Sequence, residues 1–386
     1  MKRKLLIITA ILSMVITLVG CTTQQTSTST ATVPSSTQAT TTLSPISVPS
    51  SVSGIETTLE SIYSRVNPSV VLINVVLPPS ISSLGGSALG SGFVWDTQGD
   101  IVTNNHVIDG ASSMTVTFSD GTVIDASLVG ADTDSDLAVI KVNPSGLQLQ
   151  PVSIADSTTV QVGQLAIAIG NPYGLENTMT VGFVSAIGRL VSANQNITGP
   201  TYSIPNIIQV DTPINPGNSG GVLLNDTGAV IGVTQSIATS SGSSSGVGFA
   251  IPSSIVKQVV PALITTGHSD HPYLGVSVAT LDPNMAAAMN LSSNQHGALV
   301  EAVTSGGPAD KAGIKASNTN ITDNGQQVSV GGDVITAYNG QTVKSSDDLV
   351  TFLADSGVVG QNVTLTILRN GKQIQVQVTL GLRPNS

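Results

Sequence analysis

A serine in a glycine-rich turn is the feature of this chain best suited to covalent chemistry. It stands in the segment Gly217-Asn218-Ser219-Gly220-Gly221. Glycines adopt backbone conformations closed to residues with a Cβ, so N–H groups can converge beside the serine hydroxyl. The N–H groups of Gly217 and Ser219 would then stabilise the oxyanion of a tetrahedral intermediate, each by roughly 3–4 kcal/mol. The segment indicates a nucleophilic serine with an oxyanion hole or, taken alone, an ordinary tight turn.

A histidine upstream of this serine can supply the base that its hydroxyl needs. His268, His271 and His296 all lie C-terminal to the serine segment, so His106 is the histidine that precedes it. His106 follows an apolar strand expected at residues 101–104, at the start of a polar turn. Rigid strands commonly hold catalytic side chains at such positions. His106 is therefore the expected general base, and a surface or capped histidine is the alternative.

A buried carboxylate must fix the imidazole tautomer, and one acidic turn offers three. Asp132, Asp134 and Asp136 precede the β-branched run 137–142. Asp136 abuts that strand, which would set its direction, whereas Asp132 and Asp134 are expected to solvate or cap the turn. The turn lacks the glycine and distal glutamate of an EF-hand loop, so no metal site is expected there.

The order His106, Asp136, Ser219 is the chymotrypsin order and differs from that of subtilisins and α/β-hydrolases. Further motifs follow the same order along the chain: Thr103-Asn104-Asn105-His106-Val107-Ile108, Ser135-Asp136-Leu137-Ala138-Val139-Ile140, Gly170-Asn171-Pro172-Tyr173-Gly174-Leu175, Gln209-Val210-Asp211-Thr212-Pro213-Ile214-Asn215-Pro216 before the serine turn, and Gly248-Phe249-Ala250-Ile251-Pro252. With these motifs the chain resembles the HtrA/Deg family of serine proteases. The resemblance implies a mostly β protein: a chymotrypsin/trypsin-like double β-barrel followed by a C-terminal PDZ domain.

Composition and charge fit this reading and exclude other classes. Aromatic residues make up 3% and charged residues 9%, as in a β-rich protein with a low-complexity tail. The formal net charge of −10 disfavours nucleic-acid binding. The single cysteine, Cys21, leaves no disulfide, no cysteine nucleophile elsewhere and no zinc–thiolate site, and no cofactor is expected.

The N-terminal residues are expected to direct secretion rather than to form part of the folded domains. Lys2-Arg3-Lys4 precedes an apolar run at residues 5–19, which is short for a membrane span and typical of a signal peptide. Residues 18–21 resemble a bacterial lipoprotein box, which implies cleavage after residue 20 and lipidation of Cys21. An ordinary secretory signal or an uncleaved anchor is the alternative. Residues 21–54 are rich in Ser, Thr and Pro and are expected to form a flexible tether, with a reach of roughly 30 Å. An O-glycosylated stalk, stiffer but with the same role, is the alternative.

Short strands separated by turn signals are expected through the protease domain, residues 55–264, after an amphipathic stretch at 55–66. The first barrel would use residues 70–77, 91–95, 101–104, 113–118, 123–130 and 138–142. The second would use residues 165–170, 179–186, 207–210, 221–224, 230–237 and 246–250. Pro261 is expected to end or kink a short helix after Ser253, before a linker at 265–271.

The last region, residues 271–382, resembles a PDZ domain. Tyr273, Leu274, Gly275 and Val276 would form its carboxylate-binding loop, in which successive N–H groups hold the C-terminus of a peptide that adds as a strand. A helix near residues 346–355 would flank the groove. A polar insertion at 316–327 has no assigned function.

Specificity and regulation are less directly encoded. The segments 212–214 and 235–237 would wall the primary pocket, with Ile214, Ser236 and Ile237 as its residues. No carboxylate is expected at its base, which favours cleavage after small aliphatic residues. By resemblance, Arg189 belongs to a sensor loop that relays PDZ contacts, and the short segment 78–89 favours a simple homotrimer.

The expected function is that of an extracytoplasmic, membrane-anchored serine endopeptidase. It would cleave unfolded or misfolded proteins in envelope quality control and the stress response, and would capture peptide C-termini at the PDZ groove. A catalytically silent, chaperone-like scaffold or a hydrolase of other acyl substrates is the alternative.

Overall fold

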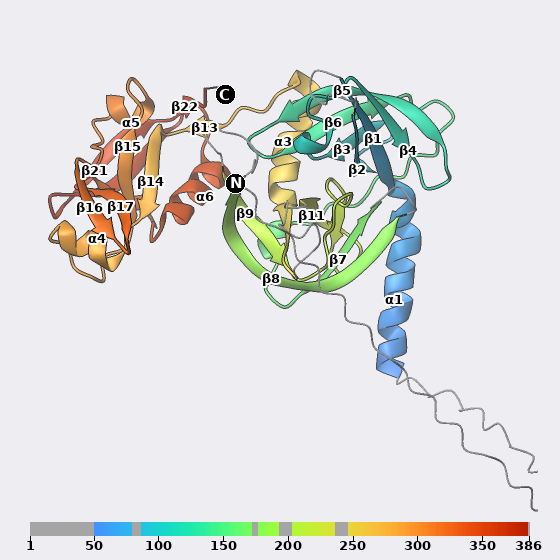
Figure 1. Ribbon diagram of the computed structural model, residues 1–386, viewed down its shortest axis with the longest axis horizontal. Coiled ribbons are helices and arrows are strands. Elements are labelled where there is room, and N and C mark those ends of the chain that lie inside the picture. The colour runs from blue at the N-terminus through green and yellow to red at the C-terminus, as the bar shows by residue number, and fades with distance from the viewer. Residues whose placement is uncertain (1–49, 79–85, 172–176, 193–202, 236–245, 385–386) are drawn as a thin grey trace, which may run out of the picture. The chain divides into compact units, whose positions relative to one another are not determined.

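The computed structural model describes residues 50–78, 86–171, 177–192, 203–235 and 246–384 (Figure 1). Strands dominate these ranges, as expected for a mostly β chain. None of the helices described there is both long and apolar enough to cross a membrane.

The first barrel is a closed sheet with the strand order β1-β2-β3-β6-β5-β4. Its strands are β1 (Val70–Leu77), β2 (Gly86–Val94), β3 (Asp100–Thr103), β4 (Ser113–Thr117), β5 (Val123–Asp132) and β6 (Leu137–Val142). Alternate residues of β1 (Val71, Ile73 and Val75) are fully buried, as the period of two along a strand requires. Ile73 of β1 lies opposite Val116 of β4, and this pairing closes the barrel and removes its free edges.

The second barrel is closed in the order β10-β11-β12-β9-β8-β7. Its strands are β7 (Leu165–Gly170), β8 (Thr178–Ser192), β9 (Ser203–Val210), β10 (Val222–Leu224), β11 (Val230–Gln235) and β12 (Gly248–Pro252). One apolar cluster joins the barrels: Phe93 and Leu137 of the first pack with Ile167 and Val233 of the second. Each such side chain contributes roughly 1.5–3 kcal/mol by leaving water, so the shared core fixes one barrel against the other.

Helices connect and brace the barrels: α1 (Ser50–Val66), the 3₁₀ turn Asn67–Ser69, α2 (Asn105–Ile108), the 3₁₀ turn Ser157–Thr159 and α3 (Ser253–Thr266). Helix α3 continues past Pro261, so the expectation that this proline could end the helix is wrong. Buried residues on both sides of the proline, among them Val256, Val260 and Leu263, hold the helix on the core. Gly267 ends it instead, with φ 79° and its N–H donated to the Leu263 carbonyl.

The C-terminal region folds around a six-stranded sheet in the order β14-β15-β18-β20-β21, with β19 paired to β18. Its elements are β13 (Pro272–Tyr273), β14 (Val276–Thr280), α4 (Pro283–Ala288), β15 (Ala298–Val303), α5 (Pro308–Lys311), β16 (Thr319–Asp323), β17 (Gln326–Val330), β18 (Val334–Tyr338), β19 (Gln341–Thr342), α6 (Ser346–Ser356), β20 (Asn362–Arg369), β21 (Lys372–Thr379) and β22 (Gly381–Leu382). Helix α6 starts with a capping box between Ser345 and Asp348. The polar insertion at 316–327 lies largely in the β16–β17 hairpin.

Candidate active site

His106 and Asp136 form a close pair in the first barrel. His106 lies in α2, directly after β3, and Asp136 lies in the turn between β5 and β6. The His106 Nδ1 atom is 2.7 Å from Asp136 Oδ2, and the His106 backbone N–H donates to Asp136 Oδ1 at 2.9 Å. The Asp136 side chain is 2% exposed, whereas that of His106 is 38% exposed. The buried carboxylate therefore orients the imidazole and leaves Nε2 as the nitrogen that can take a proton.

The backbone of Asp136 is held in an uncommon conformation. Its φ angle is 53°, in the left-handed region that few residues other than glycine occupy. Two groups from the turn before His106 bind its carbonyl: the Asn104 side-chain amide at 2.9 Å and the Asn105 N–H at 3.1 Å. These bonds hold the aspartate against the segment that carries the histidine.

Ser219 lies in the turn before β10, in the second barrel, and is buried. Gly217 and Gly220 in this turn have φ angles of 96° and 84°. A Cβ on Gly220 would lie 2.2 Å from the Ser91 carbonyl oxygen, so this position requires glycine. The N–H groups of Asn218, Gly220 and Gly221 donate to backbone carbonyls and fix the shape of the turn. Oxyanion binding by the N–H groups of Gly217 and Ser219 stays a prediction.

The first barrel also holds the serine turn. Ser91 of β2 donates its N–H to the Ser219 carbonyl at 2.8 Å and its hydroxyl to the Gly217 carbonyl at 2.6 Å. The same hydroxyl accepts the Asn171 N–H at 2.8 Å. Ser91 was not singled out from the sequence, because only the fold brings β2 beside the serine turn.

The proposed specificity and sensor residues are described only in part. Ile214 is buried in the interior of the second barrel, with its side chain against Gly248. Ser236 and Ile237 lie outside the described residues. Arg189 is exposed on β8, opposite Ile207 of β9. All four remain proposals.

Asp132 and Asp134 have partners that the sequence did not indicate. Asp132 is 6% exposed and accepts a hydrogen bond from His271 Nε2 at 2.9 Å, and Arg383 Nη1 lies 2.9 Å from Asp134 Oδ2. The expected capping role is confirmed for Asp132, which accepts the Asp134 N–H and the Ser135 hydroxyl. Both aspartates also form ion pairs that the sequence did not predict. His271 is 139 positions from Asp132, and Arg383 is 249 positions from Asp134, so no local sequence pattern reveals either pairing.

The ion pair with Asp132 favours the protonated form of His271. Burial lowers the pKa of His271, but the hydrogen bond and charge of Asp132, with a smaller effect of Asp134, outweigh it, so its pKa lies above the usual 6.5. Side-chain ligand atoms of Asp132, Asp134 and His271 lie within 4.8 Å of one another, a spacing that a metal ion could use. The Arg383 guanidinium already neutralises Asp134, which argues against a second cation there.

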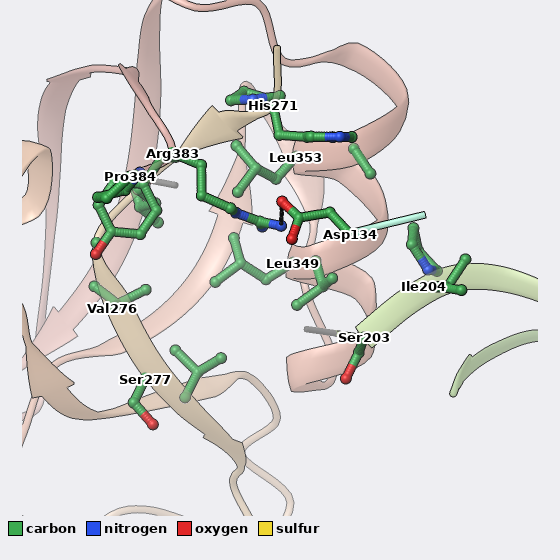
Figure 2. A pocket seen from close by; sticks show the side chains of 18 of the residues that line it. Asp134, Ser203, Ile204, His271, Val276, Ser277, Leu349, Leu353, Arg383 and Pro384 are labelled. Carbon is green, nitrogen blue, oxygen red and sulfur yellow. Dashed lines mark hydrogen bonds and ion pairs between the residues drawn. The ribbon is translucent and has the colours of Figure 1, made fainter. Parts of the chain in front are cut away.

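A groove runs between β14 and α6 in the C-terminal region (Figure 2). It belongs to a cavity of about 750 Å³. Val276 and Ser277 line it from β14, and Leu349 and Leu353 from α6. Strand β14 is at the edge of its sheet, so its outer side can accept a further strand.

The loop before β14 is held in place through its carbonyl groups. Gly275 has φ 80°, and the carbonyls of Leu274 and Gly275 accept N–H groups of Ala309 and Thr304. The loop's carbonyls are thus used inside the domain. Tyr273, Leu274, Gly275 and Val276 remain the proposed carboxylate-binding loop, in which N–H groups would face a peptide C-terminus.

Comparison with known proteins gives the same two parts. Residues 90–233 match the model of a trypsin-like peptidase domain, and residues 272–380 match that of a PDZ domain. A probable periplasmic serine endoprotease, DegP-like, of Brucella suis is 41% identical over 298 residues, covering 77% of this chain and 53% of that protein. The periplasmic pH-dependent serine endoprotease DegQ of Escherichia coli is 39% identical over 300 residues, covering 77% of this chain and 60% of the relative.

Solved structures of similar length agree. The HtrA-type protease AlgW with a tripeptide is 32% identical, with a TM-score of 0.69, and the match covers 85% of this chain and 98% of that one. The chain spans about half the length of the DegP-like relatives, at 53%. The chain therefore belongs to the HtrA/Deg family of serine proteases, with one trypsin-like peptidase domain and one PDZ domain.

Proposed function

We propose that this protein is a serine endopeptidase in which His106, Asp136 and Ser219 form the catalytic triad. The observation that carries the proposal is the pair of hydrogen bonds that the Asp136 carboxylate accepts from His106, one from the backbone N–H and one from Nδ1. It leaves the imidazole with one available nitrogen and a buried negative charge behind it. The serine turn, built on glycines with positive φ, supplies the nucleophile from the other barrel.

The reaction follows from these groups. His106 takes the Ser219 proton as the hydroxyl oxygen attacks the scissile carbonyl, and the N–H groups of Gly217 and Ser219 stabilise the resulting oxyanion. The imidazolium then gives its proton to the leaving amine, and an acyl-enzyme forms. Water, activated by the same imidazole, hydrolyses the ester and restores the serine.

The substrates we propose are unfolded or misfolded proteins, cut after small aliphatic residues. Ile214, Ser236 and Ile237 would wall the primary pocket, and an apolar Ile214 offers no partner for a basic side chain. The groove between β14 and α6 would capture peptide C-termini, with their carboxylates on the loop from Tyr273 to Val276. Arg189 would relay that binding to the serine turn.

The proposed setting is outside the cytoplasm of a bacterium, in envelope quality control, and the periplasmic relatives of Brucella suis and Escherichia coli support it. The proposed mature protein starts at Cys21, lipidated and fixed to a membrane, after a signal peptide of residues 1–20. A tether, predicted at 21–54, would carry the protease domain at 55–264 and the PDZ domain at 271–382. Helix α1 already begins at Ser50, which shortens the tether at its C-terminal end. A homotrimer is the proposed assembly.

Turnover of casein by the full chain, with Ser219→Ala as control, tests the proposal. Cleavage by the wild type and none by the variant, at equal thermal stability, is the expected result. The second candidate is a scaffold that binds peptides without cutting them, and the open edge of β14 favours it. A wild type that binds peptides but cleaves neither casein nor short peptides would support that candidate.

A further inference from the structure

Gln235, the last residue of β11, contacts the aspartate of the proposed triad. Its side-chain Nε2 donates to Asp136 Oδ2 at 2.9 Å, across 99 positions of the chain. Gln235 is 5% exposed, so this bond is shielded from water. An ionised carboxylate only accepts hydrogen bonds, and therefore the NH₂ end of the amide must face Asp136.

The Asp136 carboxylate receives three described hydrogen bonds, and two of them come from His106. The backbone N–H of His106 reaches Oδ1, and its Nδ1 reaches Oδ2 at 2.7 Å. Gln235 is the described donor to this carboxylate that comes from the second barrel. It shares Oδ2 with the imidazole, so it acts on the oxygen that faces the catalytic base.

The same end of β11 also holds the nucleophile turn. Thr234 exchanges backbone bonds with this turn, accepting from Gly220 at 2.9 Å and donating to Gly221 at 3.0 Å. Its hydroxyl donates to the Asn218 carbonyl at 2.5 Å. Two consecutive residues of one strand thus bind the serine turn and the aspartate.

We infer that Gln235 is a positioning residue of the proteolytic reaction, which sets the orientation and effective charge of Asp136 toward His106 and ties both to the barrel that carries Ser219. The inference rests on the proposed function. A hydrogen bond to an ionised group in a water-excluded site is strong, and donation to Oδ2 withdraws part of the charge that the imidazole experiences. Loss of the donor would leave a buried carboxylate less satisfied and freer to rotate.

The other charged groups near this carboxylate are already paired. Asp132 and Asp134 of the same turn bind His271 and Arg383. Among the described side chains, Gln235 and His106 are the ones that bind the Asp136 carboxylate.

Two substitutions separate positioning from packing. Gln235→Leu keeps most of the bulk and removes the donor. Gln235→Glu keeps the shape but places a second carboxyl group beside Asp136, and two adjacent carboxyl groups retain one shared proton to higher pH than either alone. While that proton is held, the introduced group can donate as the amide does, and once it is lost two negative charges face each other.

The experiment measures kcat and KM of the full-length protein for a short peptide reporter between pH 5.5 and 9. We expect Gln235→Leu to lower kcat by about 10- to 100-fold with KM within about threefold, as for loss of an interaction that acts in the transition state. We expect Gln235→Glu to be within about tenfold of wild type near pH 6 and to lose at least a further tenfold by pH 9, where the wild type keeps its plateau.

Val233→Ala is the matched control, because Val233 is fully buried on the same strand and belongs to the apolar core. It should lower the melting temperature and leave the midpoints of the pH profile unchanged. Gln235 variants whose profiles keep the wild-type midpoints and plateau would overturn the inference. A wild type without Ser219-dependent cleavage would instead overturn the proposed function, and the role of Gln235 with it.

Discussion

His271 Nε2 lies 2.9 Å from both carboxylate oxygens of Asp132, on the turn that carries Asp136. On the same turn, Arg383 binds Asp134 at 2.9 Å. His271 precedes β13 and Arg383 follows β22, and these two strands pair with each other. The two ends of the PDZ region thus hold the turn of the proposed catalytic aspartate.

The raised pKa of His271 predicts a stability term that depends on pH. A histidine whose folded pKa exceeds its unfolded value of 6.5 adds stability that is complete below 6.5 and is lost as the pH rises through the folded pKa. We therefore expect His271→Gln to lower the free energy of unfolding more at pH 5.5 than at pH 8.5. Denaturant unfolding at both pH values measures this, and an equal loss at both would contradict the charged pair.

How far the sequence predicts the structure depends on whether a feature is local. The strand at 70–77 was predicted with the bounds of β1, because its run of mostly β-branched residues is bounded by Pro68 on one side and by Pro78 on the other. The strand predicted at 179–186 proved too short. β8 runs on to Ser192, because its register shifts let it pair with β9 past Gly188.

Contacts between residues that are distant in sequence leave no local pattern from which they could be predicted. Gln235 and Asp136 are 99 positions apart, and His271 and Asp132 are 139 apart. An isolated glutamine or histidine is an ordinary residue in a sequence, and only the closed barrels bring each to its carboxylate. The triad residues were singled out because each lies in a local motif, whereas these partners do not.

The proposed triad predicts non-additive losses. Ser219→Ala and His106→Ala should each remove about 10⁶ of kcat, and the double variant should be no slower than either, because the two groups act in one proton transfer. Asp136→Asn should cost about 10⁴, because it stabilises the wrong tautomer. Reporter cleavage measures all four, and a double variant far slower than both single ones would refute a shared unit.

The proposed lipidation at Cys21 predicts that the protein is found on a membrane. Cys21→Ser should release the chain from membranes or leave an unprocessed precursor, because the lipid on the cysteine sulfur and the acyl group on the new N-terminus would supply the anchor. Fractionation and mass spectrometry of the mature N-terminus measure this. A mature chain with an unmodified, internal Cys21 would refute the anchor.

The proposed coupling between the groove and the protease domain predicts activation by peptides. Asn206 of β9 donates to the Asp355 carboxylate of α6 at 2.9 and 3.1 Å, which joins the β8–β9 pair to the groove helix. A peptide with an apolar C-terminus should then raise cleavage of a short reporter by about 5- to 150-fold. Arg189→Ala should reduce this stimulation without weakening peptide binding to the full chain carrying Ser219→Ala.

The competing account is that the groove only delivers substrates. In that case a peptide that is shown to bind would leave reporter cleavage unchanged in the wild type. Deletion of the PDZ region would then slow the cleavage only of large substrates whose own C-termini bind in the groove.

The most direct test of the account is covalent labelling of the serine. A fluorophosphonate loses fluoride to an activated serine oxygen and forms a stable phosphonyl ester, which peptide mass spectrometry can place. The account predicts one label per chain, on Ser219, with labelling abolished in Ser219→Ala and slowed by several orders of magnitude in His106→Ala. Proteolysis by a wild-type chain that carries no label on Ser219, or a label rate unaffected by His106→Ala, would contradict it.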